Sequence, residues 1–190
     1  MNIIPTLLDG VLLIEPKVFG DARGYFFESW NRKKYEALGI NCNFMQDNES
    51  CSRKGVLRGL HYQMPPYTQA KLVRVIHGTV LDVAVDIRKG SPTFGKHVAV
   101  ELSGENKRQL FVPRGFAHGF VVLSEEAVFA YKCDNTYAPT HERGIACDDP
   151  VLAINWQLEK DQWLLSEKDR KNVLLKDAEL FDYEKKEYLL

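Results

Sequence analysis

The chain has few cysteines, almost no net charge and no long hydrophobic run. Its 190 residues contain four scattered cysteines and no C-x-x-C pair: Cys42, Cys51, Cys133 and Cys147. This pattern favours reduced, structural thiols over disulfides or zinc ligands. The formal net charge of −1 provides no overall basic field for nucleic acid or an anionic membrane. A charged ligand would therefore need a local cluster of arginine and lysine.

Targeting and nucleotide-fold signals are also missing. No apolar run is long enough to span a bilayer, and Met1–Pro5 lacks the basic and apolar regions of a signal peptide, so we expect a cytoplasmic protein. There is no G-x-G-x-x-G, no P-loop and no alternation of strands and helices, which argues against a dinucleotide-binding fold. Length and ordinary hydrophobicity, with no internal repeat or linker, predict one domain over residues 1–190.

Strand patterns dominate the middle of the chain. From Val56 to about Lys132, short apolar or alternating segments are separated by turns such as His77-Gly78 and Gly90–Thr93. Short strands at regular spacing predict an all-β fold, either a sandwich or a jelly-roll barrel.

The two ends of the chain have different patterns. Asn31 has the character of a helix cap, and Gly39 that of a helix stop, so a short helix is expected to run from Asn31 through Leu38. Residues 16–24 have the composition of a loop. From Asp161 onward, apolar residues recur at helical spacing, which predicts short helices on the outside of the barrel, mostly C-terminal.

One apolar segment, Gly55–Gln63, carries an unusual set of polar side chains. On a strand, His61 and Gln63 would share one face, and Leu60 and Tyr62 the other. Polar groups on one face of an apolar strand either line a pocket or satisfy one another. The pattern alone leaves open whether His61 is a pocket base or a core histidine.

His118 lies in a Pro-x-Gly-x-x-His segment, Pro113–Gly119. This spacing resembles the second half of the signature of cupins, which are jelly-roll barrels. Metal-binding cupins carry His-x-His and a carboxylate in the first half, where this chain has only His61. Zinc or iron normally needs three or four protein ligands, and His61, His118 and Gln63 make a poor set. We therefore expect no metal, with a histidine available for acid/base chemistry.

Two further residues suit proton transfer at a barrel mouth. Tyr131 ends a strand and could act as an acid, although a buried aromatic in the core is the alternative. Lys71 begins a strand and could stabilise a developing negative oxygen, although a solvated edge lysine is the alternative.

Six motifs in one order resemble the dTDP-4-dehydrorhamnose 3,5-epimerase family over nearly the full chain. These motifs are Phe19–Gly24, Leu57–Gln63, Gln69–Val73, Val85–Thr93, Pro113–Phe120 and Leu165–Asp169. The resemblance implies a cofactor-free epimerase that inverts C3 and C5 of dTDP-4-dehydro-6-deoxy-D-glucose. The product is dTDP-4-dehydro-L-rhamnose, in dTDP-L-rhamnose biosynthesis.

The resemblance also implies roles for particular residues. His61 matches the base, Asp169 its carboxylate partner, Tyr131 the acid and Lys71 the cation near the enolate oxygen. Substrate-binding positions are matched by Arg23, Glu28, Gln46, Asn48, Arg58, His118, Glu142 and Lys168, with Asp47 in the same polar run. Phe19 and Tyr137 match aromatic packing for the nucleotide end.

The family forms homodimers in which N-terminal strands join the neighbour's sheet, and the resemblance implies the same here. Phe19 and Arg23 would then reach the partner's site. Three alternatives stay open: an epimerase acting at C3 or C5 only on a related nucleotide 4-keto-6-deoxy sugar, a non-catalytic sugar-binding cupin, and a metal-dependent cupin oxygenase.

Overall fold

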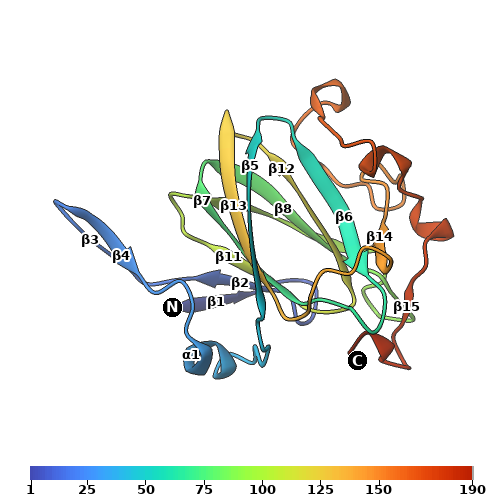
Figure 1. Cartoon of the computed structure of the whole chain (residues 1–190), viewed down its shortest axis with the longest axis horizontal. Coiled ribbons are helices and arrows are strands. Elements are labelled where there is room, and N and C mark those ends of the chain that lie inside the picture. Colours follow the sequence, from blue (N-terminus) through green and yellow to red (C-terminus); the bar gives the residue numbers. More distant parts are fainter. Residues whose placement is uncertain (190) are drawn as a thin grey trace.

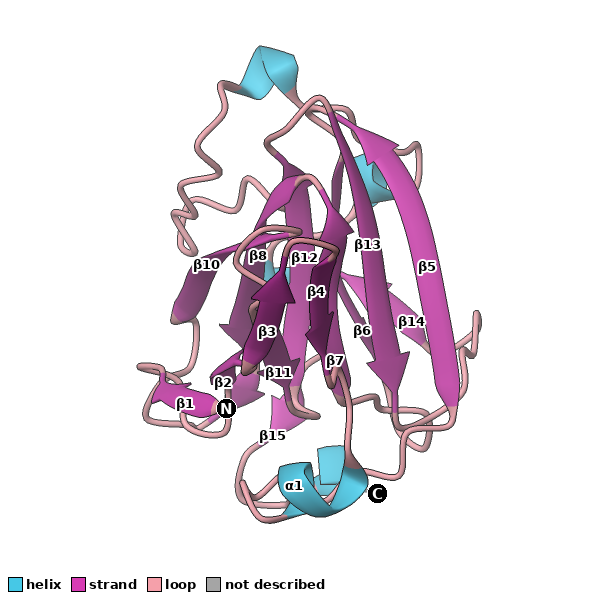
Figure 2. Cartoon of the chain, turned by 90° about the vertical axis from the view of Figure 1, so that its left-hand side faces the viewer, coloured by secondary structure: helices cyan, strands magenta, loops and turns pink. Residues whose placement is uncertain are grey.

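Strands dominate the computed structural model, which describes residues 1–189. Two antiparallel sheets make up most of it (Figures 1 and 2). The six-stranded sheet has the order β1 (Asn2–Pro5), β2 (Leu12–Glu15), β11 (Gln109–Val112), β7 (Lys71–His77), β13 (Glu126–Cys133) and β5 (Gln46–Arg53). The five-stranded sheet has the order β10 (His97–Ser103), β8 (Thr79–Asp86), β12 (Phe116–Val122), β6 (Leu57–Gln63) and β14 (Glu142–Gly144). The predicted predominance of strands is confirmed.

The main core lies between the two sheets. Val73 and Phe129 of the six-stranded sheet belong to one buried cluster with Ala84 and Phe120 of the five-stranded sheet. The side chains of β8 alternate between this core and the opposite face, as its sequence predicts. Full burial of a large apolar side chain stabilises the fold by roughly 1.5–3 kcal/mol, so this cluster fixes how the sheets face each other.

The C-terminal segment covers the outer face of the five-stranded sheet (Figure 1). Leu81, Val83 and Val85 of β8 are buried there in one cluster with Trp156 and Phe181. The segment contains only short elements: the 3₁₀ turns η1 (Lys160–Gln162), η2 (Asp169–Lys171), η3 (Leu175–Asp177) and η4 (Glu187–Leu189), and β15 (Phe181–Asp182), which pairs with β9 (Arg88–Lys89).

The expectation of C-terminal helices therefore needs correction, because only single 3₁₀ turns form. Leu164 bridges to Val56, just before β6, and Val173 bridges to Ile145, just after β14, so the backbone of this segment pairs beside the five-stranded sheet. Main-chain groups that bond to a neighbouring strand are not available for helical hydrogen bonds. The apolar residues at helical spacing instead pack on the sheet from extended chain.

The N-terminal part confirms one local prediction and corrects another. Helix α1 (Arg32–Glu36) is capped by Asn31, whose side chain accepts a hydrogen bond from the Lys34 amide at 3.2 Å. Residues expected to be loop instead form β3 (Val18–Asp21), which pairs with β4 (Gly24–Phe27). None of the helices in residues 1–189 has the length and apolar character needed to cross a membrane.

The β3–β4 hairpin, called the arm below, projects away from the two main sheets (Figure 1). Its apolar side chains are exposed: Val18 by 41%, Phe19 by 54%, Tyr25 by 59% and Phe26 by 70%. Most of the arm therefore lacks cover from its own chain.

A β-bulge in β6 decides which of its side chains face the space between the two main sheets. Phe120 pairs with Arg58 and His118 with His61, so Gly59 and Leu60 lie opposite Gly119 alone. A Cβ atom on Gly59 would lie 2.6 Å from the Gly119 Cα. Any residue other than glycine would therefore clash with the neighbouring strand at this position. The extra residue puts Arg58 and His61, three apart in sequence, on the same side of the strand.

Candidate active site

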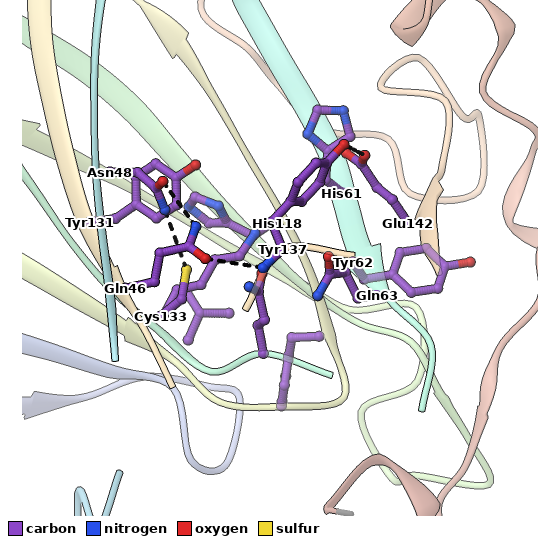
Figure 3. A pocket seen from close by; sticks show the side chains of 14 residues that line it. Gln46, Asn48, His61, Tyr62, Gln63, His118, Tyr131, Cys133, Tyr137 and Glu142 are labelled. Carbon is purple, nitrogen blue, oxygen red and sulfur yellow. Dashed lines mark hydrogen bonds between the residues drawn. The ribbon is translucent and has the colours of Figure 1, made fainter. Parts of the chain in front are cut away.

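A cavity of about 360 Å³ opens between the two sheets. Both sheets contribute polar side chains to its wall (Figure 3). The lining side chains include Gln46, Asn48, His61, Gln63, Gln69, Lys71, His118, Tyr131, Cys133, Tyr137 and Glu142. His61 and Gln63 share the inner face of β6, while Leu60 and Tyr62 belong to the outer cluster, as the alternation predicts.

His61 forms a short hydrogen bond with a carboxylate 108 residues downstream. Its Nε2 atom lies 2.5 Å from Oδ1 of Asp169. The other carboxylate oxygen of Asp169 accepts a hydrogen bond from the Ser166 hydroxyl at 2.8 Å, and that hydroxyl accepts one from the Asp169 amide. Asp169 begins η2, so the C-terminal segment supplies the carboxylate that bonds to His61.

The charge state of Asp169 follows from these contacts. Burial by itself would raise the pKa of Asp169, but the hydrogen bonds from His61 and Ser166 hold that pKa below its usual value. Asp169 is therefore a carboxylate at neutral pH and accepts the Nε2 proton of His61. The other ring nitrogen of His61 bonds to nothing among residues 1–189.

A second histidine–carboxylate pair lies beside the first. His118 is directly opposite His61 in the ladder, and its Nε2 lies 3.0 and 3.1 Å from the two carboxylate oxygens of Asp82. Asp82 is fully buried, and His118 is its sole hydrogen-bond donor within residues 1–189. Alternation along β8 puts Asp82 on the same face as Ala84, but it does not identify Asp82 as the partner of His118. A charged residue among inward-facing apolar residues was the available signal.

Tyr131 and Lys71 come from adjacent strands on the opposite sheet. The Lys71 Nζ atom lies 6.0 Å from the centre of the Tyr131 ring and pairs with no carboxylate within residues 1–189. Burial lowers the pKa of Lys71. Burial also raises the pKa of Tyr131, so its phenol keeps its proton at neutral pH. The cavity wall thus holds an unpaired amine beside a neutral acid.

At the cavity mouth, the carboxylate of Glu142 connects the loop that carries Tyr137 to the C-terminal segment. The Tyr137 hydroxyl donates a hydrogen bond of 2.5 Å to Glu142, and the Lys168 ammonium donates another to the same oxygen. Burial opposes ionisation, but Lys168 and Tyr137 hold the pKa of Glu142 below its usual value. The Gln46 side chain accepts a hydrogen bond from the Tyr137 amide at 3.0 Å and donates one to Asn48. Gln46, Asn48, Tyr137, Glu142 and Lys168 are therefore brought together, as expected.

Other expected contact residues lie outside this cavity. Arg58 is exposed on β6, and its guanidinium donates to the Ser52 hydroxyl at 3.1 Å. Asp47 faces the other side of β5, where Lys132 pairs with it at 2.9 Å, because neighbours on a strand point to opposite faces.

Phe19 and Arg23 belong to the arm, and Glu28 directly follows it. Arg23 pairs with Asp21 at 2.6 Å, and Glu28 pairs with Lys34 at 2.7 Å. The single chain therefore leaves Phe19, Arg23 and Glu28 away from its own cavity.

The chain was compared with known proteins. The family model described as dTDP-4-dehydrorhamnose 3,5-epimerase matches residues 5–177. The chain belongs to this family. The dTDP-4-dehydrorhamnose 3,5-epimerase of Shigella flexneri is 57% identical over 95% of this chain and 99% of that protein.

Solved structures of dTDP-sugar epimerases agree with this family membership. A dTDP-6-deoxy-D-glucose-3,5-epimerase of Legionella pneumophila in complex with dTDP-4-keto-L-rhamnose has 56% identity and a TM-score of 0.92, covering 96% of this chain and 98% of that one. A 3'-monoepimerase of Streptomyces bikiniensis in complex with dTDP-quinovose has 34% identity and a TM-score of 0.87, covering 95% of this chain and 93% of that one.

The region that matches the dTDP-4-dehydrorhamnose 3,5-epimerase family includes every residue lining the cavity, and Asp169 as well. Within residues 1–189, no group of three or more histidine, cysteine, aspartate or glutamate side chains could hold a metal ion. His61 and His118 each bond instead to a carboxylate of their own.

Proposed function

We propose that this protein inverts C3 and C5 of dTDP-4-dehydro-6-deoxy-D-glucose and forms dTDP-4-dehydro-L-rhamnose. The names of its relatives and their high identity support this reaction. The observation that carries the proposal is the facing arrangement of the cavity: the His61–Asp169 pair on one sheet, with Tyr131 and Lys71 on the other.

The proposed chemistry is proton removal and return beside a ketone. The C4 carbonyl acidifies the C–H bonds at C3 and C5. His61 takes the proton, and the electrons of the C–H bond move towards the carbonyl oxygen, which gives an enolate. Lys71 stabilises the enolate oxygen by its charge. Tyr131 then gives a proton to the carbon from the opposite face, which inverts the centre. His61 releases its proton to solvent and Tyr131 takes one up, so both groups are ready to act on the second carbon.

Each remaining group has a role in this scheme. Asp169 fixes the ring orientation and tautomer of His61. We propose that His118, Gln46, Asn48, Glu142 and Lys168 bind the substrate and that Tyr137 packs against its nucleotide. The reaction moves protons only, and no electrons leave the substrate, so the proposal needs no redox cofactor.

We infer further that the fold is a cupin-type jelly roll in one domain, and that the functional unit is a homodimer. Two facing antiparallel sheets support the first inference, and the exposed aromatics of the arm support the second. Arg23, Glu28 and Phe19 would contact the substrate in the partner's cavity, with Arg58 and Asp47 near its edge. The cysteines Cys42, Cys51, Cys133 and Cys147 are free thiols, which agrees with the proposed cytoplasmic location.

Turnover in D₂O tests the reaction. Incubating the protein with dTDP-4-dehydro-6-deoxy-D-glucose should place deuterium at both C3 and C5, because each carbon receives its new proton from groups that exchange with solvent. NMR of the product measures label at each carbon, and a protein-free sample gives the background exchange. Label at one carbon only would identify a mono-epimerase, and background labelling at both would identify a non-catalytic binding protein.

Sedimentation velocity tests the homodimer. At micromolar concentration, the wild type should sediment with the mass of two chains. Phe26→Ser removes a side chain that is 70% exposed, and it should weaken the dimer by roughly 10²-fold, because two copies of Phe26 lose buried apolar area. Val151→Ser, on a side chain 73% exposed in the C-terminal segment, is the matched control and should leave the dimer intact. A monomeric wild type would contradict the proposal.

A further inference from the structure

Gln63 uses its whole side chain to hold two loops at the cavity mouth. It is the last residue of β6, and it lies two residues beyond His61 on the same face. Only 4% of Gln63 is exposed. Its Nε2 atom donates to the carbonyl oxygens of Tyr67 at 2.5 Å and Thr136 at 3.1 Å, and its Oε1 atom accepts from the Ala138 amide at 2.7 Å.

Two of these hydrogen bonds go to the residues directly before and after Tyr137 in the chain. Thr136 and Ala138 precede and follow it in the chain, and Gln46 binds its own amide at 3.0 Å. Three consecutive residues are therefore fixed through main-chain groups. Tyr137 is nevertheless 52% exposed, and its hydroxyl hydrogen-bonds to Glu142 at the cavity mouth. Its position at the cavity mouth thus depends on how firmly its backbone is held.

We propose that Gln63 is a positioning residue that fixes Tyr137 in the place where it packs against the nucleotide end of the substrate. This inference rests on the proposed function. Holding an aromatic side chain in its bound position before the ligand arrives lowers the entropy cost of binding. Because Gln63 and His61 lie on the same strand, the hydrogen bonds of Gln63 also fix the distance between the loop that carries Tyr137 and the proposed base.

The bonding pattern requires an amide at this position. Gln63 must donate to two carbonyl oxygens and accept from one amide, and only a carboxamide does both. Methionine has a similar length but would leave all three main-chain groups without their partner. Glutamate keeps the shape and the acceptor but loses both donors, and its charge would face two carbonyl oxygens.

A double-mutant cycle on ligand binding tests the proposal. The variants are Gln63→Met, Tyr137→Ala and both together, with dTDP as the probe. Calorimetry gives Kd for dTDP, and steady-state kinetics give KM and kcat for the nucleotide sugar. We expect Gln63→Met to raise Kd and KM about 10-fold and to change kcat less than 3-fold. Adding Gln63→Met to Tyr137→Ala should weaken dTDP binding by less than 2-fold, because the aromatic group is already absent.

Asn106→Ala is the matched control. Asn106 also makes three main-chain hydrogen bonds, to Ser103, Arg108 and Glu101, in the turn between β10 and β11. It should lower the melting temperature and leave Kd and KM within 2-fold of the wild type. Gln63→Glu repeats the test if Gln63→Met does not fold, and the same 10-fold rise is expected.

Two results would overturn the inference. Additive effects of Gln63→Met and Tyr137→Ala on Kd would mean that Gln63 does not act through Tyr137. A rise in Kd as large for Asn106→Ala would mean that general loosening explains the loss. Because dTDP binding needs no turnover, a wild type without epimerase activity would contradict the proposed function and leave this cycle valid.

Discussion

His61→Ala is expected to lower the rate of epimerisation by about 10²–10⁴-fold, the usual contribution of a positioned general base. The variant loses the ring nitrogen that accepts the proton, while Tyr131 and Lys71 stay in place. Deuterium exchange at C3 and C5 should fall by the same factor, because both proton removals are assigned to His61. NMR of the substrate and product in D₂O measures both carbons in one sample.

The folded state should survive this change. The His61 side chain is 27% exposed and lines the cavity, so its removal opens no sealed hole in the core. Circular dichroism checks the fold. His77→Ala, at the exposed end of β7, makes the same substitution outside the cavity and should retain wild-type activity. Exchange at a near-normal rate in His61→Ala would show that another group is the base.

Lys71→Met is expected to reduce kcat by about 10²–10³-fold, as the loss of one group that stabilises an oxyanion does. The same change should make the substrate-free protein more stable. Burial lowers the pKa of Lys71, and no carboxylate within residues 1–189 pairs with its ammonium. Burying this unpaired charge costs folding free energy, and methionine replaces it with an apolar side chain of similar length. Steady-state kinetics and thermal unfolding measure the two effects.

The stability gain should depend on pH in one direction. As the pH rises through the folded-state pKa towards the usual value of 10.5, the folded wild type releases its Lys71 proton before the unfolded chain does. The unfolded state then binds more protons, so wild-type stability rises relative to Lys71→Met and the gain shrinks. Lys89→Met, on an exposed lysine of β9, is the control and should change neither activity nor stability. A destabilised Lys71→Met would contradict this account.

Local patterns predicted the parts of the site that depend on local geometry. Alternation put His61 and Gln63 on one face of β6. The helix cap at Asn31 was predictable because it depends only on residues within the same turn. Residues far apart in sequence were reached only through the family resemblance. Nothing in the residues around His61 points to Asp169, because their contact depends on the whole path of the C-terminal segment.

Long-range packing explains what the sequence did not predict. Strict alternation would separate Arg58 from His61, and they share a side because the Gly59 bulge closes on Gly119 of another strand. Helical spacing after Asp161 did not give helices, because the backbones of Leu164 and Val173 pair with those of Val56 and Ile145. Alternation puts Asp82 on one face of β8 with Ala84, but the pairing of Asp82 with His118 needs β8 and β12 to be neighbours.

The irregular C-terminal segment has a consequence for the order in which the site is assembled. During synthesis, the barrel strands that carry His61, Lys71 and Tyr131 leave the ribosome before Asp169 does. Until then the proposed base lacks the carboxylate proposed to orient it, and Leu81, Val83 and Val85 lack the cover that Trp156 and Phe181 provide. Docking of the C-terminal segment therefore covers the outer face of the five-stranded sheet and also brings Asp169 to His61, so an incomplete chain carries a cavity in which His61 has no carboxylate partner.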